Sequence, residues 1–397
     1  MKTRYLFTML LSLIITSCSN DLALKRKANE LAQKFIITDG HIDIPWRLAD
    51  AYEDLSVRTP KGDFDFVRAQ EGGLNVPFMS VYVPADYQKT GGAKEKADSL
   101  IDLVNRIADD HPDKFEVAYS LSDANRIVEE GKIALPMGME NGAPIEDDIK
   151  NVQYFYDRGI RYITLTHSKD NLICDSSYDT TPNKWGGLSP FGKKVVKEMN
   201  RVGIMVDISH VTDEVINQVL DLTNVPVIAS HSSCRYFTPG FERNMGDNEI
   251  KRLKENGGVI QINFGSTFLT KESQDKRNDN TAKIEEFAKT NNLSEGNKDL
   301  ETYTKSINLK NPIYADVTDV ADHIDHAVKL AGIDHVGLGS DYDGVGDSLP
   351  YGLKDAASYP NLIYHLLKRG YSEEDIEKIC YKNIWRVWAA VEAYAQK

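Results

Sequence analysis

Cysteine is scarce in this 397-residue sequence, which contains four cysteines and no CxxC pair. So few thiols exclude a dense disulfide framework, and a closed thiolate zinc site usually needs cysteines in close pairs. If Cys18 is modified as described below, Cys174, Cys234 and Cys380 remain. Three thiols still allow one bridge in an oxidising compartment, so the sequence leaves a single disulfide open.

Long hydrophobic runs are missing beyond the N-terminus. The run from Tyr5 to Ile15 follows Lys2 and Arg4, and charged residues return at Asp21. A stretch this short is not a stable membrane span, because a helix needs about 20 apolar residues to cross a bilayer. The pattern is instead typical of an export signal.

Residues 15–18, with the sequence ITSC, resemble a bacterial lipobox, in which the cysteine becomes the lipidated first residue. We therefore expect residues 1–17 to be a lipoprotein signal peptide, Cys18 to be lipidated and residues 18–33 to be an N-terminal tether. Acyl chains would then anchor the exported protein to a bacterial membrane, at the periplasmic or surface face of the cell envelope. A plain secretory cleavage site is the alternative.

An excess of basic charge is also missing, since 47 Lys and Arg stand against 60 Asp and Glu, for a net charge of −13. So acidic a chain is a poor partner for nucleic acid. Internal repeats and low-complexity tracts are not evident, and the first predicted strand lacks the glycine-rich turn of dinucleotide-binding sheets.

Short β-branched runs do occur, and they alternate with helical patterns from residue 36 almost to the end. Eight of these runs are predicted strands: 36–44, 76–83, 133–139, 162–166, 204–209, 225–230, 259–264 and 335–340. Amphipathic stretches between them include 95–108, 191–202, 247–255 and 317–331. Eight such units predict an α/β fold, a (β/α)8 TIM barrel that forms a single catalytic domain over residues 34–397.

Two segments interrupt this alternation. Residues 47–72 look like an extended loop after the first strand, and residues 270–312 form a charged insertion after the seventh. Loops that follow barrel strands lie on the face where active sites are built. The insertion is therefore open to three interpretations: a lid, a contact between the copies of a homodimer, or a solvated helical excursion.

Four of the nine histidines stand at the ends of predicted strands, namely His41, His167, His210 and His231. Strand ends converge on one space in a barrel, so these imidazoles are expected to meet. The other histidines have no such position: we expect His111, His323 and His326 at the surface, and His335 and His365 in structural roles.

The same strand ends carry carboxylates. Asp43 lies two residues after His41 and shares its strand face, so that both can reach one ion. Glu140 ends the third predicted strand and can bridge two cations, with His210 and His231 on the second. Each ion then has three protein ligands and an open position, which is a catalytic coordination pattern. Carboxylate and imidazole ligands favour two Zn²⁺ ions, with Mn²⁺ or Co²⁺ as substitutes.

Six motifs in order resemble the membrane (renal) dipeptidase family, peptidase family M19, an amidohydrolase-like group, here in a bacterial lipoprotein form. They are residues 39–43 (DGHID), 138–142 (GMENG), 162–167 (YITLTH), 206–210 (VDISH), 230–233 (SHSS) and 339–344 (GSDYDG). The resemblance covers residues 34 to 390 and implies the binuclear zinc centre just described. It also implies that His167 contacts the substrate, that Arg243 binds its carboxylate and that Asp341 transfers protons.

These roles suit the hydrolysis of dipeptides that have a free C-terminal carboxylate. A hydroxide held between two cations is a strong nucleophile, and Asp341 could carry its proton to the leaving amine. Asp343 has the same strand parity, so only the resemblance favours Asp341. Two other functions stay open: another binuclear barrel hydrolase, acting on a cyclic amide or phosphoester, and a non-catalytic lipoprotein that binds peptides.

Overall fold

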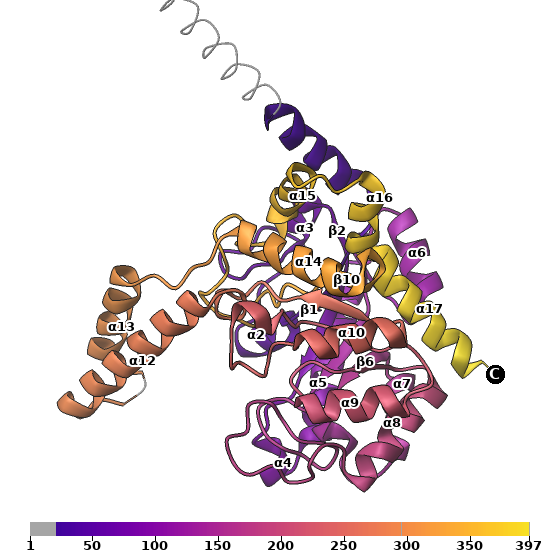
Figure 1. Ribbon diagram of the computed structural model, residues 1–397, viewed down its shortest axis with the longest axis horizontal. Helices are drawn as coiled ribbons and strands as arrows, with labels where there is room; N and C mark the ends of the chain where they lie inside the picture. Colours follow the sequence, from indigo (N-terminus) through magenta and orange to yellow (C-terminus); the bar gives the residue numbers. More distant parts are fainter. Residues whose placement is uncertain (1–20, 295, 397) are drawn as a thin grey trace, which may run out of the picture.

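Eight parallel strands close into a barrel in the computed structural model, which describes residues 21–294 and 296–396 (Figure 1). Around the barrel the strands follow the order β1, β10, β9, β8, β7, β6, β5, β2. Their bounds are β1 Ile37–Ile42, β2 Leu74–Tyr82, β5 Met137–Glu140, β6 Ile160–Thr164, β7 Met205–Asp207, β8 Ile228–Ala229, β9 Val259–Ile262 and β10 Val336–Leu338. The predicted (β/α)8 barrel is confirmed.

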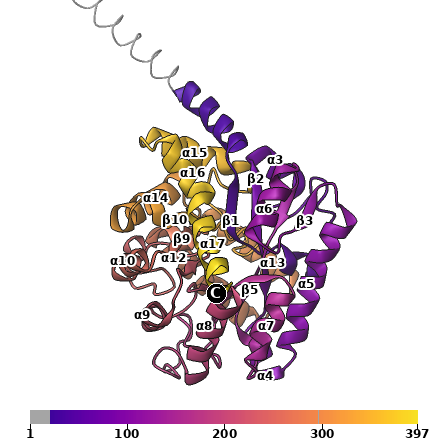
Figure 2. The same ribbon diagram turned by 90° about the vertical axis from the view of Figure 1, so that its right-hand side faces the viewer.

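Helices surround the barrel, as Figures 1 and 2 show from two directions 90° apart. The α-helices are α2 Ile44–Asp50, α3 Phe66–Gly72, α4 Tyr87–Thr90, α5 Ala93–Asp110, α6 Leu121–Glu129, α7 Lys150–Asp157, α8 Pro190–Val202, α9 Asp213–Leu222, α10 Asp247–Asn256, α11 Ser266–Leu269, α12 Lys271–Asn291, α13 Lys298–Lys310, α14 Val317–Ala331, α15 Tyr359–Lys368, α16 Glu373–Glu377 and α17 Asn383–Ala395. Shorter turns of helix are η1 Ala143–Ile145, η2 Arg235–Phe237, η3 Ile333–His335, η4 Ala356–Ser358 and the π-helix η5 Lys378–Lys382.

Local sequence signals set the helix ends. The Ser189 side chain accepts a hydrogen bond from the Gly192 amide, Pro190 opens α8, and Gly203 ends it in a left-handed conformation. Asp316 and Asp319 form a capping box at the start of α14. These signals explain why helices predicted at 191–202 and 317–331 begin and end within a residue of their observed bounds.

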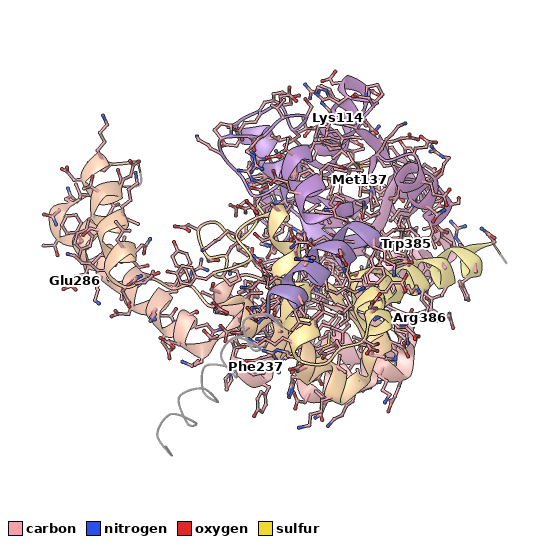
Figure 3. The ribbon with its side chains drawn as sticks, turned by 90° about the horizontal axis from the view of Figure 1, so that it is seen from above. Lys114, Met137, Phe237, Glu286, Trp385 and Arg386 are labelled. Atoms are coloured by element: carbon pink, nitrogen blue, oxygen red, sulfur yellow. The ribbon has the colours of Figure 1, made fainter. Side chains whose placement is uncertain are left out.

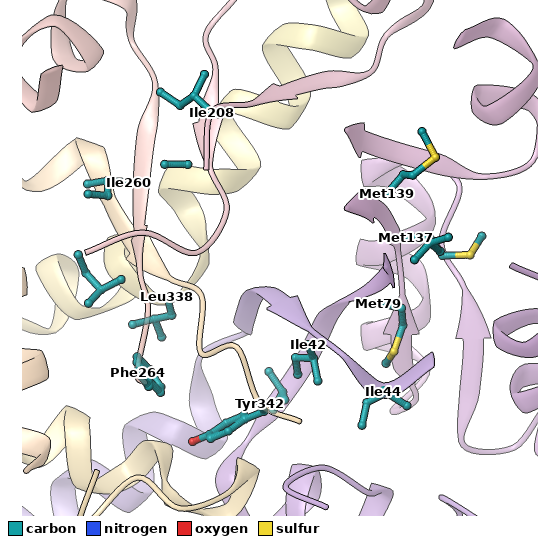
Figure 4. Packing of buried hydrophobic residues seen from close by; sticks show 14 of the residues in the cluster. Ile42, Ile44, Met79, Met137, Met139, Ile208, Ile260, Phe264, Leu338 and Tyr342 are labelled. Carbon is teal, nitrogen blue, oxygen red and sulfur yellow. The ribbon is translucent and has the colours of Figure 1, made fainter. Parts of the chain in front are cut away.

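The barrel wall packs through apolar side chains from neighbouring strands. Figure 4 shows Ile42, Met79, Met139 and Leu338 among the buried residues of the main hydrophobic cluster. A second cluster, which includes Phe78 and Trp388, attaches the C-terminal helix α17 to the barrel. This burial fixes the strands and therefore the positions at which they end.

The third predicted strand, 133–139, is divided at Pro136. Residues Ile133–Leu135 form β4, which pairs with β3, Phe115–Val117, in a separate two-stranded sheet. Only β5 enters the barrel, where it pairs with β2 and β6. Proline has no N–H to donate to a ladder, and its carbonyl accepts a hydrogen bond from Met79, so the chain changes sheets at this residue.

Residues 47–72 are only in part the extended loop that we expected, because α2 ends at Asp50 and α3 begins at Phe66, with residues 51–65 as a loop between them. The Asp65 side chain caps α3 by accepting a hydrogen bond from the Arg68 amide. Residues 21–34 form a helix whose Ala28, Leu31 and Ala32 side chains are buried, and this helix covers most of the tether that we expected at residues 18–33.

The charged insertion is a helical hairpin of α12 and α13, which projects away from the barrel (Figure 1). Figure 3 shows Glu286 on this hairpin, far from Met137 in the barrel wall. The rings of Phe287 and Tyr303 stack with centroids 3.9 Å apart and hold the two helices together. The predicted helical excursion is therefore present.

Cys174, Cys234 and Cys380 are free and buried, so they form no disulfide with one another. Cys18 and the expected signal peptide lie outside the described residues. Within residues 21–294 and 296–396, no helix has both the length and the apolar character needed to cross a bilayer.

Candidate metal centre and active site

Each predicted metal ligand lies at the carboxyl end of a barrel strand or directly after it. His41 is the second-to-last residue of β1, and Asp43 directly follows that strand. Glu140 is the final residue of β5. His210 comes three residues after β7, and His231 two residues after β8. Parallel strands deliver their carboxyl ends to one face of the barrel, which brings the five side chains together.

The Glu140 carboxylate stands at the centre of this cluster. One of its oxygens, Oε2, lies 3.4 Å from His41 Nε2, and His41 Nε2 lies 3.5 Å from Asp43 Oδ2. The other oxygen, Oε1, lies 3.0 Å from His210 Nε2 and 3.4 Å from His231 Nε2. The two oxygens therefore face two different sets of donors.

Groups of three donors within 4.8 Å of one another recur in this cluster: His41, Glu140 and His231; Glu140, His167 and His210; His41, Asp43 and Asp341. The distances thus establish one shared cluster of ligand atoms. They also allow His41 and His231 to bind the same ion, so these groups alone do not assign each ligand to one of two ions.

Backbone strain marks the same strand ends. His210, Asp341 and Asp343 have φ values of 69°, 62° and 64°, in the left-handed region that residues other than glycine rarely adopt. Each such residue costs about 1–3 kcal/mol and persists only where the surrounding fold enforces it. Strain of this kind gathers at functional sites, where it aims a side chain.

The charges of the cluster favour bound cations. Burial lowers the pKa of His210 and of His231 well below the usual value, so both imidazoles are neutral and can ligate. Burial also opposes a charge on His41, yet Tyr162, Glu140 and Asp43 outweigh it and raise its pKa well above normal. The carboxylates therefore attract positive charge to the centre of the cluster.

Three buried polar atoms of the predicted metal ligands have no hydrogen-bond partner among the described residues: His41 Nε2, Asp43 Oδ1 and His210 Nδ1. Leaving a buried donor or acceptor unsatisfied costs about 1–3 kcal/mol, which proteins rarely accept without a ligand. All three atoms belong to residues predicted to hold a metal. The donor set, its neutral imidazoles and these unpartnered atoms together fit metal ions.

Hydrogen bonds to Nδ1 fix the orientation of two of the imidazoles, those of His41 and His231. The Tyr162 hydroxyl lies 2.7 Å from His41 Nδ1, and the Ser230 hydroxyl lies 2.8 Å from His231 Nδ1. Ser230 in turn donates to Asp207 Oδ2 at 2.6 Å. These three supporting roles were not predicted from the sequence, although Tyr162 and Asp207 share an inward strand position with nearby predicted ligands.

A cavity of about 1050 Å³ opens above the cluster. Its wall includes Asp43, Glu140, His167, His210, His231, Asp341 and Asp343, together with the aromatic residues Trp46, Tyr82, Tyr178, Phe241 and Phe268. Its volume is at the upper end of the range for small-molecule sites. The cluster therefore forms the floor of an open pocket that has room for a small substrate.

His167 and Asp341 reach this cavity, as predicted. His167 Nε2 lies 3.7 Å from Glu140 Oε1, and its ring lies against Tyr82. Asp341 accepts a hydrogen bond from Asn263 at 2.7 Å, while burial and the charges of Asp43 and Glu140 raise its pKa to about 7. A carboxyl with that pKa can exchange protons near neutral pH.

Asp343 is held differently, which separates it from Asp341. Its Oδ1 accepts a hydrogen bond from the Asp63 amide and lies 3.3 Å from Arg47 Nε. Asp341 instead belongs to a group with His41 and Asp43. The geometry therefore supports Asp341 for proton transfer, a choice that strand parity left open.

Arg243 is buried beside the cavity and is not part of its wall. Its terminal nitrogens donate to Ser232 Oγ and to the His231 carbonyl, both at 2.9 Å, and its Nε has no hydrogen-bond partner among the described residues. A guanidinium has five N–H donors, so three stay free after these two bonds. Arg243 keeps the capacity to bind a carboxylate, from a position set by the His231 backbone.

The remaining histidines lie outside the cluster, but one prediction about them is wrong. His323 is fully buried in α14, where its Nδ1 accepts a hydrogen bond from the Cys234 amide and its Nε2 lies 2.8 Å from the Leu269 carbonyl. It ties α14 to the loops above the barrel. His111 and His326 are partly exposed beside Asp54 and Asp247.

The family model described as membrane dipeptidase (peptidase family M19) matches residues 25–397. The chain belongs to this family. It is 35% identical over 372 residues to dipeptidase tcpJ of Claviceps purpurea (strain 20.1), which covers 90% of this chain and 77% of the relative. Together with the cluster of potential metal ligands, this membership makes the chain a metallo-dipeptidase of the M19 family, and the two alternative functions are set aside.

Solved structures agree with this family assignment. The "probable dipeptidase PvdM" of Pseudomonas aeruginosa is 26% identical, with a TM-score of 0.79 over 94% of this chain and 99% of that one. A metallo peptidase of Rhodobacter sphaeroides, solved with a phosphinate mimic of the dipeptide L-Ala-D-Ala, is 22% identical, with a TM-score of 0.74 over 90% and 99%. At that identity, the second likeness supports the fold alone.

Proposed function

We propose that this metallo-dipeptidase uses two zinc ions that share Glu140. In this assignment His41, Asp43 and Glu140 hold one ion, and Glu140, His210 and His231 hold the other. The observation that carries the assignment is the division of the Glu140 oxygens, with Oε2 toward His41 and Oε1 toward His210 and His231. A carboxylate with donors on both sides is suited to bridge two cations.

Zinc is the metal that this donor set favours. Three imidazoles and two carboxylates, without cysteine, suit Zn²⁺ well, and Mn²⁺ or Co²⁺ could substitute. Three protein ligands on each ion leave a position for solvent or substrate, as catalytic sites require. When bound, the ions would supply an activated water and polarise the peptide carbonyl.

The residues around the cavity orient the substrate and move protons. His167 is placed to donate a hydrogen bond to the carbonyl oxygen as negative charge develops on it. Asp341 takes a proton from the attacking water and returns it to the leaving amine. The free N–H groups of Arg243 bind the C-terminal carboxylate, which limits the enzyme to very short peptides.

A panel of dipeptides that vary in sequence and in the chirality of the second residue tests this function. The purified protein should release amino acids from dipeptides with a free carboxylate and leave their C-terminal amides intact. A chelator should abolish this activity, and zinc should restore it. Protein that holds two metal ions per chain but cleaves no dipeptide would contradict the proposal.

We also propose that the enzyme works in the cell envelope, anchored through a lipid on Cys18. The support is the sequence of residues 1–18 alone, with its basic start, its apolar run and its lipobox-like end. Cells that express the full chain should incorporate radiolabelled palmitate into it and retain it in the membrane fraction. A Cys18→Ala variant should lose the label, and equal labelling of both proteins would rule out this anchor.

A further inference from the structure

The rim of the cavity includes side chains from the projecting hairpin. Gln274, Arg277 and Asn278 of α12 line the same cavity as Glu140 and His210. The Gln274 side chain donates to the Thr267 carbonyl at 2.8 Å, and Arg277 Nη1 lies 3.5 Å from Thr267 Oγ1. These contacts hold the first turns of α12 against α11 at the mouth of the pocket.

Arg277 has no carboxylate partner within 4 Å among the described residues, although acidic side chains surround it on α12. Those acids pair with lysines four positions away, as Lys271–Asp275, Glu272–Lys276 and Asp279–Lys283. Arg277 has Ser273 and Thr281 at the corresponding positions. Its charge is therefore left available at the rim, in a chain whose net charge is −13.

The other cation in the cavity wall is already paired. Lys169 Nζ lies 3.3 Å from Asp179 Oδ1. This carboxylate partly neutralises the lysine charge that a ligand in the cavity would otherwise meet. Arg277 is thus the rim cation best placed to recruit an anion.

Helix α11 relates Arg277 to Arg243. Arg243 Cζ lies 5.2 Å from the centroid of the Phe268 ring, and Arg277 Nη1 lies 3.5 Å from Oγ1 of the neighbouring Thr267. Both guanidinium groups therefore lie against adjacent residues of α11, whose side chains line the cavity. A residue whose main-chain carboxylate reaches toward Arg243 would direct its own side chain along this wall toward Arg277.

We propose that Arg277 binds a carboxylate side chain on the C-terminal residue of the substrate, so that the enzyme prefers dipeptides that end in aspartate or glutamate. This inference rests on the proposed function, because Arg243 sets which end of the dipeptide faces this wall. The planar guanidinium suits a carboxylate, with which it can form two parallel hydrogen bonds. The hairpin thus contributes a specificity residue from outside the barrel.

Matched dipeptides test the proposal through kcat/KM. Ala-Glu and Ala-Gln differ in charge at the second residue, and Glu-Ala and Gln-Ala differ at the first. The wild-type enzyme should cleave Ala-Glu about fivefold faster than Ala-Gln, the effect of roughly 1 kcal/mol for a partly exposed ion pair. The ratio for Glu-Ala over Gln-Ala should stay near one, and added salt should reduce the Ala-Glu preference.

Arg277→Gln should bring the ratio of Ala-Glu to Ala-Gln close to one, mainly through a higher KM for Ala-Glu. Lys289→Gln is the matched control, because Lys289 is an exposed cation on the same helix that does not line the cavity. This control should keep the wild-type ratio. Arg277→Lys should keep part of the preference, since it retains the charge without the planar donors.

Three results would overturn the inference: no acidic preference in the wild type, a preference that survives in Arg277→Gln, or an equal loss for Ala-Glu and Ala-Gln. The last would assign Arg277 to the main-chain carboxylate. Failure of the proposed function looks different, because the wild type would then cleave none of the four dipeptides.

Discussion

At the scale of single residues, hydrogen bonds to Nδ1 orient the imidazoles of His41 and His231. The Tyr162 ring crosses the barrel above Gly138, where a side chain's Cβ would come within 1.9 Å of Tyr162 Cζ. Glycine at this position therefore lets the Tyr162 hydroxyl reach His41. Such supporting bonds fix the tautomer and orientation of a ligand and commonly change metal affinity 10–100-fold.

Tyr162→Phe should weaken zinc binding by about tenfold, because it removes the hydrogen bond to His41 Nδ1 and keeps the ring that fills the space. Competition with a chromophoric chelator measures this affinity. Tyr364→Phe is the control, since the Tyr364 hydroxyl bonds to Asp21, remote from the cluster. Equal affinities for wild type and Tyr162→Phe would show that Tyr162 does not position His41.

His323 makes a separate prediction about pH. Burial lowers its pKa to about 4, whereas an unfolded histidine has a pKa of about 6.5. As the pH falls from 6.5 to 4, His323 therefore becomes protonated in the unfolded chain but stays neutral in the folded chain. The stability associated with neutral His323 is complete above pH 6.5 and is lost across this window, by roughly 3 kcal/mol in all.

His323→Gln removes this titration and can keep both hydrogen bonds, to the Cys234 amide and the Leu269 carbonyl. Denaturant unfolding of the metal-free proteins between pH 7 and pH 4 provides the comparison. The wild type should lose about 3 kcal/mol more stability than the variant, because all other groups titrate alike in both. Parallel stability curves would mean that His323 accepts a proton in the folded state.

At the scale of elements, the barrel strands end where chemistry is needed, while the hairpin is held by few contacts. Asn280 is one of only two buried residues on α12, and none is buried on α13 within the described residues. Its side chain donates to the Asn311 backbone carbonyl at 2.9 Å and accepts from the side-chain Nδ2 of Asn311 at 2.9 Å. This polar pair, with the stacked rings of Phe287 and Tyr303, joins the two helices.

Asn280→Ala should therefore loosen the hairpin without unfolding the barrel. Removing the side-chain hydrogen bonds of Asn280 to Asn308 and Asn311 costs about 2 kcal/mol locally, so limited proteolysis between residues 271 and 310 should become several-fold faster. The thermal midpoint of the barrel should change little. Asn291→Ala is the control, since Asn291 is exposed near the end of α12 and bonds only within its own helix. Equal cleavage of all three proteins would contradict this account of the hairpin.

Element boundaries were the part of the fold that the sequence predicted least well. All eight barrel strands were predicted, because β-branched runs between amphipathic helices are typical of this fold. The run at 133–139 contains two strands, but its apolar pattern does not show where the chain leaves one sheet for another. Pro136 was the one residue that indicated this break. The helix α3 and the last residues of α2 lie within residues 47–72, and both helices are too short to show a clear periodic pattern.

At the scale of the whole molecule, the sequence was a good guide to the first layer of the site. Histidine and carboxylate at strand ends must converge in a barrel, so His41, Asp43, Glu140, His210 and His231 could be predicted together. The layer behind them could not, because Tyr162 and Ser230 look like ordinary strand residues until their distances to an imidazole are known. Arg277 was equally hidden, in an insertion whose direction no local pattern determines.

The burial of His323 shows the same limit. The polar residues His323 and Asp325 on one helix predicted a solvent-exposed face, yet His323 points toward Cys234 and Leu269. Which face of a helix packs against the barrel depends on the neighbouring elements. The sequence alone does not show whether a polar side chain will find hydrogen-bond partners in the interior.

The central claim is that five side chains from the ends of four strands hold two cations that share Glu140. Crystals grown with zinc and measured at the zinc absorption edge test it most directly. The account predicts two anomalous peaks about 3.5–4 Å apart, each about 2 Å from one Glu140 oxygen and from its own pair of donors. A single peak, or peaks that leave Glu140 on one side only, would contradict it.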